Sequence, residues 1–243
     1  MRLDKLLANT GHGSRKDVKS LLKKKRVTVN DTIVKDSSFH VDPDQDIIKV
    51  GDNTIHYQKY IYLMMNKPKG VISATEDTKD KTVIDLLTTD LQRFKPFPVG
   101  RLDKDTEGLL LITNDGELAH QLTSPKKDVG KTYVARIQGE VASEDIEKFA
   151  DGVLLEDGYK AKPAKLSIRR RGAVSEVEVT VTEGKYHQVK RMFEAVDKTV
   201  IYLKRISMGG LVLDETLKLG TYRELTENEL HYLSFKNKIN GGL

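Results

Sequence analysis

The short apolar run from Leu109 to Thr113 constrains the fold more than any other segment of this chain. It is aliphatic and is closed by Asn114-Asp115-Gly116, a pattern that predicts a buried strand ending in a tight turn. On spacing alone, the charged loop that precedes this strand is most simply solvated surface. Its place beside a buried element also fits a functional site at the edge of a sheet. The loop, Gly100 to Gly108, carries five charged residues: Arg101, Asp103, Lys104, Asp105 and Glu107.

The composition places limits on where the protein works and on what it binds. A chain of 243 residues is long enough for one large domain, or for a small domain joined to a medium one. It contains no cysteine, which excludes disulfides and thiolate metal sites and fits a reducing compartment. The N-terminus lacks an apolar signal core, and no later run is long enough to cross a bilayer. We therefore expect a cytoplasmic protein.

The distribution of charge separates the N-terminal region from the rest. Residues 1–40 contain ten Lys or Arg and four Asp, a net charge of +6. The whole chain carries only +5, so the other 203 residues sum to −1. A basic module attached to a nearly neutral body is typical of a protein that grips a polyanion with one part.

Two helices are expected at the start of that basic region. Leu3, Leu6 and Leu7 fall on one helical face, and the glycines at positions 11 and 13 end the helix. Ser14 followed by Asp17 forms a capping-box pattern that starts the second helix.

A row of basic side chains follows from the second helix. Arg15, Lys19 and Lys23 recur every four residues and so line one exposed face, and Arg26 extends the charge beyond the helix end. Such a row suits phosphates, although a basic helix is often only a solvated face. Val27 to Val34 then predicts two short β segments around an Asn-Asp turn.

Strands outnumber helices in the rest of the chain. The alternating runs Ala164 to Ile168 and Val177 to Val181 flank a basic tip and predict a hairpin. A helix is expected from His187 to Val196, with apolar residues at i, i+3, i+4 and i+7. These patterns predict an α+β fold with an antiparallel or mixed sheet. Other expected elements are a strand at 61–65, a turn with two positive charges at 67–70, a short helix at 83–87, a helix capped by Asp115, strands at 131–137 and 200–203, and a last helix capped by Thr226 with Glu229.

Four segments carry a resemblance to a known family. Gly100-Arg101-Leu102-Asp103, with Thr106 and Gly108 after it, resembles the signature loop of pseudouridine synthases, in the RsuA-type branch that acts on ribosomal RNA. Three other segments match that branch in the same order along the chain: 66–70 (Asn-Lys-Pro-Lys-Gly), 131–133 (Lys-Thr-Tyr) and 183–192 (Glu-Gly-Lys-Tyr-His-Gln-Val-Lys-Arg-Met). The resemblance implies a mainly antiparallel mixed sheet with the active-site cleft across it.

The N-terminal region resembles the S4 RNA-binding module, in which two helices and a following β-hairpin clasp structured RNA. The matching residues are Ser14-Arg15 and the segment from Arg26 to Asn30. We therefore predict two domains, an S4-like RNA-binding domain at 1–58 and a pseudouridine synthase catalytic domain at 60–243. Arg15, Lys19, Lys23 and Arg26 are the candidate RNA contacts of the first domain.

The resemblance also assigns candidate roles in the second domain. It implies that Asp103 is the essential aspartate, acting at the ribose either as a nucleophile or as a base. Lys190 stands where the family carries a basic residue that pairs with this aspartate, although it also has the spacing of an exposed partner for Glu194. Tyr133 is expected to stack on the uracil, and Arg101 to hold a phosphate or the flipped strand.

Pseudouridine formation needs no cofactor, because substrate and product are isomers. The six histidines are scattered without a metal-ligand pair, and no dinucleotide loop is credible, so no metal or other cofactor is expected.

The predicted function is isomerisation of a uridine in small-subunit 16S ribosomal RNA, of the type that modifies position 516, by a monomer acting on that RNA or on a small-subunit assembly intermediate. Two alternatives stay open at this point. One is a large-subunit 23S synthase of the same branch, and the other is a non-catalytic RNA-binding or ribosome-assembly protein.

Overall fold

The computed structural model describes residues 1–55 and 57–239, with backbone only for 234–239. The chain divides into two compact units. One comprises Met1–Ile61 with Thr88–Lys95, and the other comprises Tyr62–Leu87 with the residues from Pro96 on. The inclusion of Thr88–Lys95 in the first unit was not anticipated from the sequence, which predicted domains at 1–58 and 60–243. None of the helices in the described part of the chain is long and apolar enough to span a bilayer.

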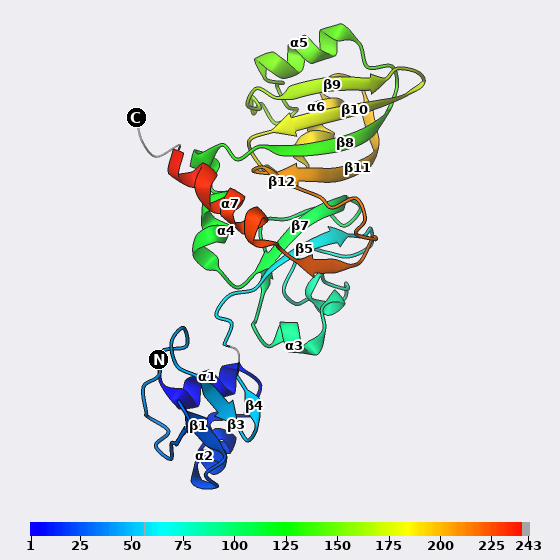
Figure 1. Ribbon diagram of the computed structural model, residues 1–243. Coiled ribbons are helices and arrows are strands. Elements are labelled where there is room, and N and C mark those ends of the chain that lie inside the picture. The colour runs from blue at the N-terminus through cyan, green and yellow to red at the C-terminus, as the bar shows by residue number, and fades with distance from the viewer. Residues whose placement is uncertain (56, 240–243) are drawn as a thin grey trace. The chain divides into compact units, whose positions relative to one another are not determined.

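The first unit is a helical pair with a small sheet (Figure 1). Its four strands lie in the order β2-β1-β3-β4, and Leu3, Leu6 and Leu7 are buried in its core as predicted. The elements are α1 (Leu3–Asn9), α2 (Arg15–Lys23), β1 (Val27–Val29), β2 (Thr32–Ile33), β3 (Ile48–Val50) and β4 (Asn53–Thr54).

Local sequence signals explain how these elements begin and turn. The Asp17 backbone N–H donates to the Ser14 hydroxyl, while the Asp17 carboxylate accepts from the Ser14 backbone N–H at 2.9 Å. This is the predicted capping box, and it fixes the start of α2. Asn30 and Asp31 have φ values of 49° and 61°, as the two central residues of a tight hairpin turn require. The predicted pair of short strands, β1 and β2, is therefore confirmed.

The second unit is built on a nine-stranded sheet (Figure 1). The strand order is β13-β5-β7-β11-β8-β10-β9, with β12 beside β11 and β6 beside β7. Among the described strands, β7 and β11 run parallel and the other pairs are antiparallel. The predicted mainly antiparallel mixed sheet is confirmed. Its strands are β5 (Tyr62–Lys67), β6 (Phe97–Pro98), β7 (Glu107–Thr113), β8 (Lys131–Gln138), β9 (Lys165–Arg170), β10 (Val174–Val181), β11 (Thr199–Met208), β12 (Leu211–Val212) and β13 (Tyr222–Glu224).

Apolar periodicity places these strands and the helices that cover them. Every residue of β7 after Glu107 is buried, as predicted for the run that ends at Thr113. In the predicted hairpin, Val177 pairs with Ile168 and Val179 with Leu166 across β10 and β9. The helices and 3-10 turns are η1 (Ile84–Leu86), α3 (Thr89–Gln92, in the first unit), α4 (Gly116–Thr123), η2 (Pro125–Lys127), α5 (Ser143–Asp151), α6 (Gln188–Glu194) and α7 (Glu227–Ile239).

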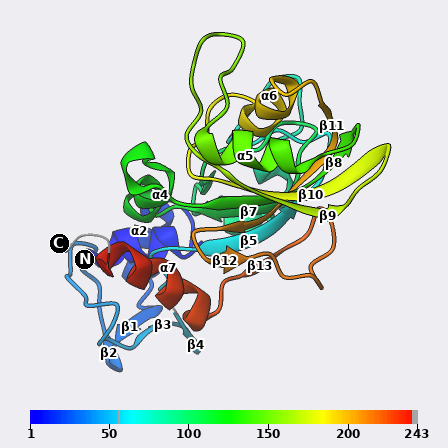
Figure 2. The same ribbon diagram turned by 90° about the horizontal axis from the view of Figure 1, so that it is seen from above.

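Two helices share one face of the sheet. Figure 2 shows α5 and α6 on the same side, and the rings of Phe149 and Phe193 join them at 4.8 Å between centroids. The predicted core face of α6 is buried: Val189, Met192, Phe193 and Val196. Helix α6 therefore packs with its apolar face inward, in contact with β11.

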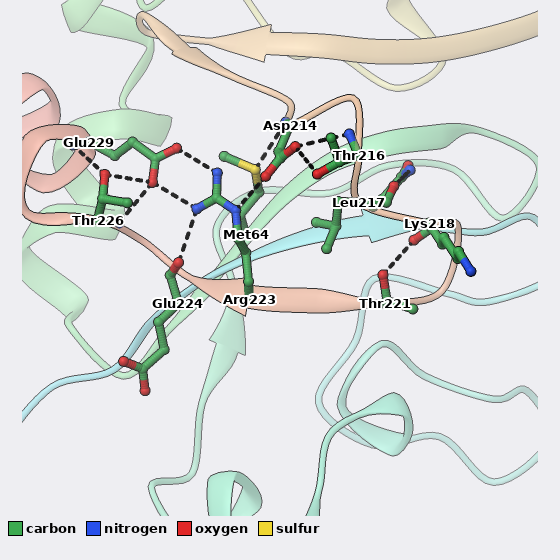
Figure 3. Close-up of polar contacts among 11 residues, drawn as sticks. Met64, Asp214, Thr216, Leu217, Lys218, Thr221, Arg223, Glu224, Thr226 and Glu229 are labelled. Carbon is green, nitrogen blue, oxygen red and sulfur yellow. Dashed lines mark hydrogen bonds and ion pairs between the residues drawn. The ribbon is translucent and has the colours of Figure 1, made fainter.

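The last helix is anchored by Arg223 on β13 (Figure 3). The Arg223 guanidinium donates to both Glu229 oxygens and to Asp214, each at 2.8 Å. Thr226 and Glu229 also form the predicted cap, with the Thr226 backbone N–H donating to Glu229 at 2.8 Å. The Arg223 hydrogen bonds lower the pKa of Glu229 to about 2, and those from Thr216 and Arg223 lower the pKa of Asp214 to about 2. The anchor therefore stays charged across the ordinary pH range.

Candidate active site

The charged loop from Gly100 to Gly108 leads into β7, and its exit is fixed by Gly108. This glycine pairs with Arg205 in the parallel register of β7 and β11 and has a φ of +102°. A Cβ at this position would lie 2.2 Å from the Arg205 carbonyl oxygen. Only glycine permits this approach, so Gly108 sets where the loop meets the sheet.

A buried ammonium group holds the loop from beneath. Lys67, the last residue of β5, is 0% exposed, and its Nζ donates to the carbonyl oxygens of Asp103 at 3.0 Å, Thr106 at 2.9 Å and Pro68 at 3.1 Å. Burial lowers the pKa of Lys67 to about 8, while the nearby loop carboxylates oppose the shift. The predicted turn with two positive charges at 67–70 begins later than expected, because β5 continues through Lys67 and the turn lies at 69–70. The charge of Lys67 is therefore used inside the protein.

Hydrogen bonds from the segment after β5 fix the loop from a second side. The Ser73 hydroxyl donates to the Leu102 carbonyl at 2.9 Å and accepts from the Leu102 backbone N–H at 3.0 Å. The Gly70 backbone N–H donates to the Lys104 carbonyl at 2.8 Å. Asp103, between these two fixed points, therefore has its backbone held in place before any ligand binds, a requirement for precise positioning of a reactive group.

Helix α6 brings Lys190 to two carboxylates of the loop. Lys190 Nζ lies 3.5 Å from Asp103 Oδ2 and donates to both oxygens of Asp105, at 2.7 and 2.9 Å. Its side chain is 16% exposed, so the alternative of an exposed Lys190 beside Glu194 does not describe the structure. Burial alone raises the pKa of Asp105, but the hydrogen bond and charge of Lys190 outweigh it and lower that pKa below its usual value.

Asp103 and Lys190 line a cavity of about 440 Å³, within the size range of small-molecule sites. The predicted residues Arg101, Asp103, Tyr133 and Lys190 all contribute to its wall. Tyr133 comes from β8, the strand predicted at 131–137, where it shares one face with the buried Ala135 and Ile137, and its own side chain is buried. The structure thus brings together the four residues of the catalytic domain that the sequence singled out.

Arg205 and Lys131 are among the cationic residues of the cavity wall that were not predicted as site residues. Arg205 on β11 is buried, and its Nε donates to the Leu109 carbonyl at 2.8 Å. Among the described residues, none accepts a hydrogen bond from its Nη2. Lys131 also lines the cavity, and burial followed by the charge of Arg205 lowers its pKa. Arg205 and Lys131 could therefore bind a hydrogen-bond acceptor or an anion in the cavity.

The segment before α6 is shaped by the buried carboxylate of Glu183. It accepts from the Gln188 side-chain amide at 2.7 Å, from the Tyr159 hydroxyl at 2.7 Å and from the Lys162 backbone N–H at 2.9 Å. His187 also lines the cavity, with its Nε2 3.7 Å from Asp103 Oδ1.

The remaining predicted RNA contacts belong to the first unit. Arg15, Lys19 and Lys23 are exposed along α2, and Arg26 is exposed just before β1. The exposure of Arg15, Lys19 and Lys23 agrees with their four-residue spacing along one helix face, and all four side chains are accessible to a polyanion.

Comparison with known proteins agrees with this arrangement. A family described as RNA pseudouridylate synthase matches residues 61–195, more than half of the chain. The chain belongs to this family. In this pseudouridine synthase the S4 domain family matches residues 1–47, so the predicted resemblance and the S4 module are both confirmed.

Three relatives match the synthase over nearly its full length. It is 55% identical to the RNA pseudouridine synthase YtzG of Bacillus subtilis, covering 96% of this chain and 98% of the relative. It is 39% identical to ribosomal small subunit pseudouridine synthase A of Escherichia coli, with 95% and 98% covered. It is 40% identical to ribosomal large subunit pseudouridine synthase B of Bacillus subtilis, with 96% and 95% covered.

Proposed function

We propose that this pseudouridine synthase isomerises a uridine of 16S small-subunit ribosomal RNA, at the position numbered 516, with Asp103, Lys190 and Tyr133 as its catalytic residues. The observation that carries the proposal is the meeting of the Asp103 carboxylate and the Lys190 ammonium, 3.5 Å apart, in the cavity that Tyr133 also lines. A carboxylate, a cation and an aromatic ring are the groups that the chemistry at a uridine requires.

The reaction exchanges one bond for another without a change in composition. The bond between N1 of the uracil and C1′ of the ribose breaks, the ring turns, and a bond forms between C5 and C1′. The proton lost from C5 is matched by the one gained at N1. Asp103 acts at the ribose as a nucleophile or as a base, and both roles need its ionised form. The ammonium group of Lys190, 3.5 Å from Asp103 Oδ2, presents the opposite charge to that form.

Tyr133 and Arg101 act on the base and on the strand. The buried Tyr133 ring offers an aromatic surface to the uracil while it is detached from the sugar. Because the reacting atoms are hidden in stacked RNA, the uridine must first turn out of the helix into the cavity. Arg101, exposed at the cavity wall, is placed to hold a phosphate of the displaced strand. The basic side chains of α2 supply further, sequence-independent affinity.

The choice of the small subunit is supported by a segment of the site. The resemblance to the small-subunit branch lies in 183–188, and this segment forms one wall of the cavity, where it meets the substrate. Overall identity gives no preference, because the small-subunit and large-subunit relatives are 39% and 40% identical. A 23S target is therefore the second candidate. We propose further that the enzyme acts as a monomer on free RNA or on an assembly intermediate.

The test is to map pseudouridines in both ribosomal RNAs of cells that lack the protein. We expect one site in 16S RNA to be lost, restored by the wild-type gene and not by Asp103→Asn, which keeps the shape of the side chain but cannot ionise. Loss of a 23S site instead would refute the small-subunit target. Normal modification by the Asp103→Asn variant would refute the assignment of Asp103, provided that the variant is folded and binds RNA as the wild type does.

A further inference from the structure

An exposed aromatic stack stands at the wall of the active-site cavity and has no part in the mechanism above. The rings of Tyr186 and His187 lie face to face, with centroids 3.8 Å apart and planes inclined by 16°. Tyr186 is 68% exposed. One face of its ring is covered by the imidazole, and most of the remaining ring surface is open to solvent.

The inner end of this stack reaches the catalytic loop. His187 Nε2 lies 3.7 Å from Asp103 Oδ1, and both aromatic residues line the cavity. His187 is held in the left-handed region, with a φ of 49°, a conformation that is uncommon for residues other than glycine and that clusters at functional sites. The backbone geometry thus turns the imidazole towards Asp103 while it supports the Tyr186 ring.

The surroundings of the stack favour a nucleic-acid base as its ligand. Lys185 is exposed next to Tyr186, with its Nζ 4.8 Å from the centroid of the Tyr159 ring. Lys185, Tyr159 and Tyr186 belong to the same cavity wall. An exposed aromatic ring on a wall that also carries positive charge suits an unpaired base, since every base has a π face and is joined to a phosphate. A uridine that turns out of its helix leaves its neighbours without a stacking partner.

We propose that Tyr186, supported by His187, is a stacking platform for an unpaired base adjacent to the target uridine in the RNA strand. The base continues the column formed by the two rings, while the uridine occupies the cavity beside Asp103. This inference rests on the RNA substrate of the proposed function, but not on which ribosomal subunit supplies it. The test therefore uses a fragment of whichever ribosomal RNA the wild type modifies, so a 23S target would refute the 16S proposal and leave this test intact.

The experiment combines protein variants with altered RNA in single-turnover assays. Tyr186→Leu removes the ring, Tyr186→Phe keeps it, and Tyr232→Leu is a matched control at a tyrosine of α7 that is 52% exposed and outside the cavity wall. The RNA is used intact and with a single abasic residue immediately 5′ or 3′ of the target. Loss of one stacked base is expected to raise the half-saturating RNA concentration about tenfold.

The platform predicts coupling between protein and RNA changes. Tyr186→Leu and one of the two abasic RNAs should each raise the half-saturating concentration about tenfold, while the two together raise it no further. Tyr186→Phe and Tyr232→Leu should respond to each RNA as the wild type does. A 2-aminopurine at the same position should be quenched on binding to the wild type and not to Tyr186→Leu.

Two results would overturn the proposal. One is wild-type binding by a folded Tyr186→Leu variant, with its thermal midpoint unchanged. The other is a combined loss of about a hundredfold, the product of independent effects, which would show that Tyr186 contacts some other part of the RNA.

Discussion

Lys190 Nζ lies 2.7 Å from Asp105 Oδ1, which makes Asp105, and not Asp103, the closer partner of the ammonium group. Asp103 Oδ2 stands at 3.5 Å. The cation is thus shared between an exposed carboxylate and one that faces the cavity. Asp105 therefore takes the shorter contacts of Lys190, and Asp103 keeps a longer ion pair on the side of the cavity.

Replacing Lys190 by Met should reduce activity most at low pH. The change keeps the apolar stem but removes the ammonium group that lowers the pKa of Asp105 and lies 3.5 Å from Asp103 Oδ2. We therefore expect the variant to lose activity first at the acid limb of the pH–rate profile, because a carboxylate without a neighbouring cation takes up a proton more readily. Asp105→Asn is the control and should leave the acid limb where it is or move it down. If Asp105→Asn is as damaging as Lys190→Met, Asp105 is itself required for catalysis.

Gly108→Ala should destabilise the catalytic domain strongly. The new methyl group would lie 2.2 Å from the Arg205 carbonyl oxygen, at a backbone φ of +102°, and we expect the free energy of unfolding to fall by about 3 kcal/mol or more. Gly116→Ala is a matched control at the start of α4, where a Cβ meets no described atom within 4 Å. It should leave stability unchanged or raise it by about 0.5 kcal/mol. Equal effects in urea unfolding would contradict the close approach of β7 and β11.

Lys67→Met should loosen the charged loop. Three carbonyl oxygens would lose their donor, so the free energy of unfolding should fall by about 2–3 kcal/mol. Lys69→Met is the control. Lys69 lies two residues after Lys67 and is exposed, so the loss of its charge should change the free energy of unfolding by less than about 0.5 kcal/mol. If Lys67→Met has the same free energy of unfolding as the wild type, the three hydrogen bonds of the ammonium group do not contribute to stability.

The same lysine predicts a dependence of stability on pH. The pKa of Lys67 is about 8 in the folded protein and about 10.4 in an unfolded chain. Between these values the unfolded chain binds more protons, so the Lys67 contribution makes the free energy of unfolding rise with pH across this window. Urea unfolding at pH 7.5 and pH 9.5 should show a larger increase for the wild type than for Lys67→Met.

Reversal of the charges along α2 should weaken RNA binding and flatten its dependence on salt. Arg15, Lys19 and Lys23 are exposed on one helix, and each phosphate contact contributes about −0.7 to −0.9 to the log–log slope. Changing all three to Glu in the full chain should lower the magnitude of the slope by about 2 to 3. Changing the same three positions to Gln removes the phosphate contacts without adding repulsion. This variant should have a slope similar to that of the Glu variant and a smaller loss of affinity. An unchanged slope would assign α2 to another partner.

The elements that follow from local patterns were predicted from the sequence, and the contacts between distant segments were not. Strand β7, the face of α6 and the hairpin of β9 and β10 each follow from the spacing of apolar residues. Lys67 and Arg205 do not, because a charge at the end or in the middle of a strand usually indicates a solvent-facing position. Their acceptors are main-chain oxygens up to 39 and 96 residues away, and no local pattern reports such a partner.

The parallel pairing of β7 with β11 is another contact between distant segments that the sequence did not predict. The glycine at 108 was part of the loop motif, but its reason, the close approach of Arg205, exists only in the folded sheet. Likewise, the spacing of Lys190 on its helix allowed a partner one turn away, and the loop that supplies Asp105 is 85 residues distant in sequence. The candidate residues and the pairing of Lys190 with Asp103 came from the motifs, whereas Asp105, the closer partner of Lys190, is found only in the tertiary structure.

The bonds from Lys67 to the charged loop all end on main-chain oxygens. The path of the loop backbone therefore depends on Lys67 of β5, and these bonds involve none of the loop's own side chains. Positions such as 101, 104 and 105 can be exchanged for other residues while the path of the backbone persists. A library randomised at these positions, with Lys67 and the glycines kept, would present different side chains at the cavity on an unchanged loop backbone.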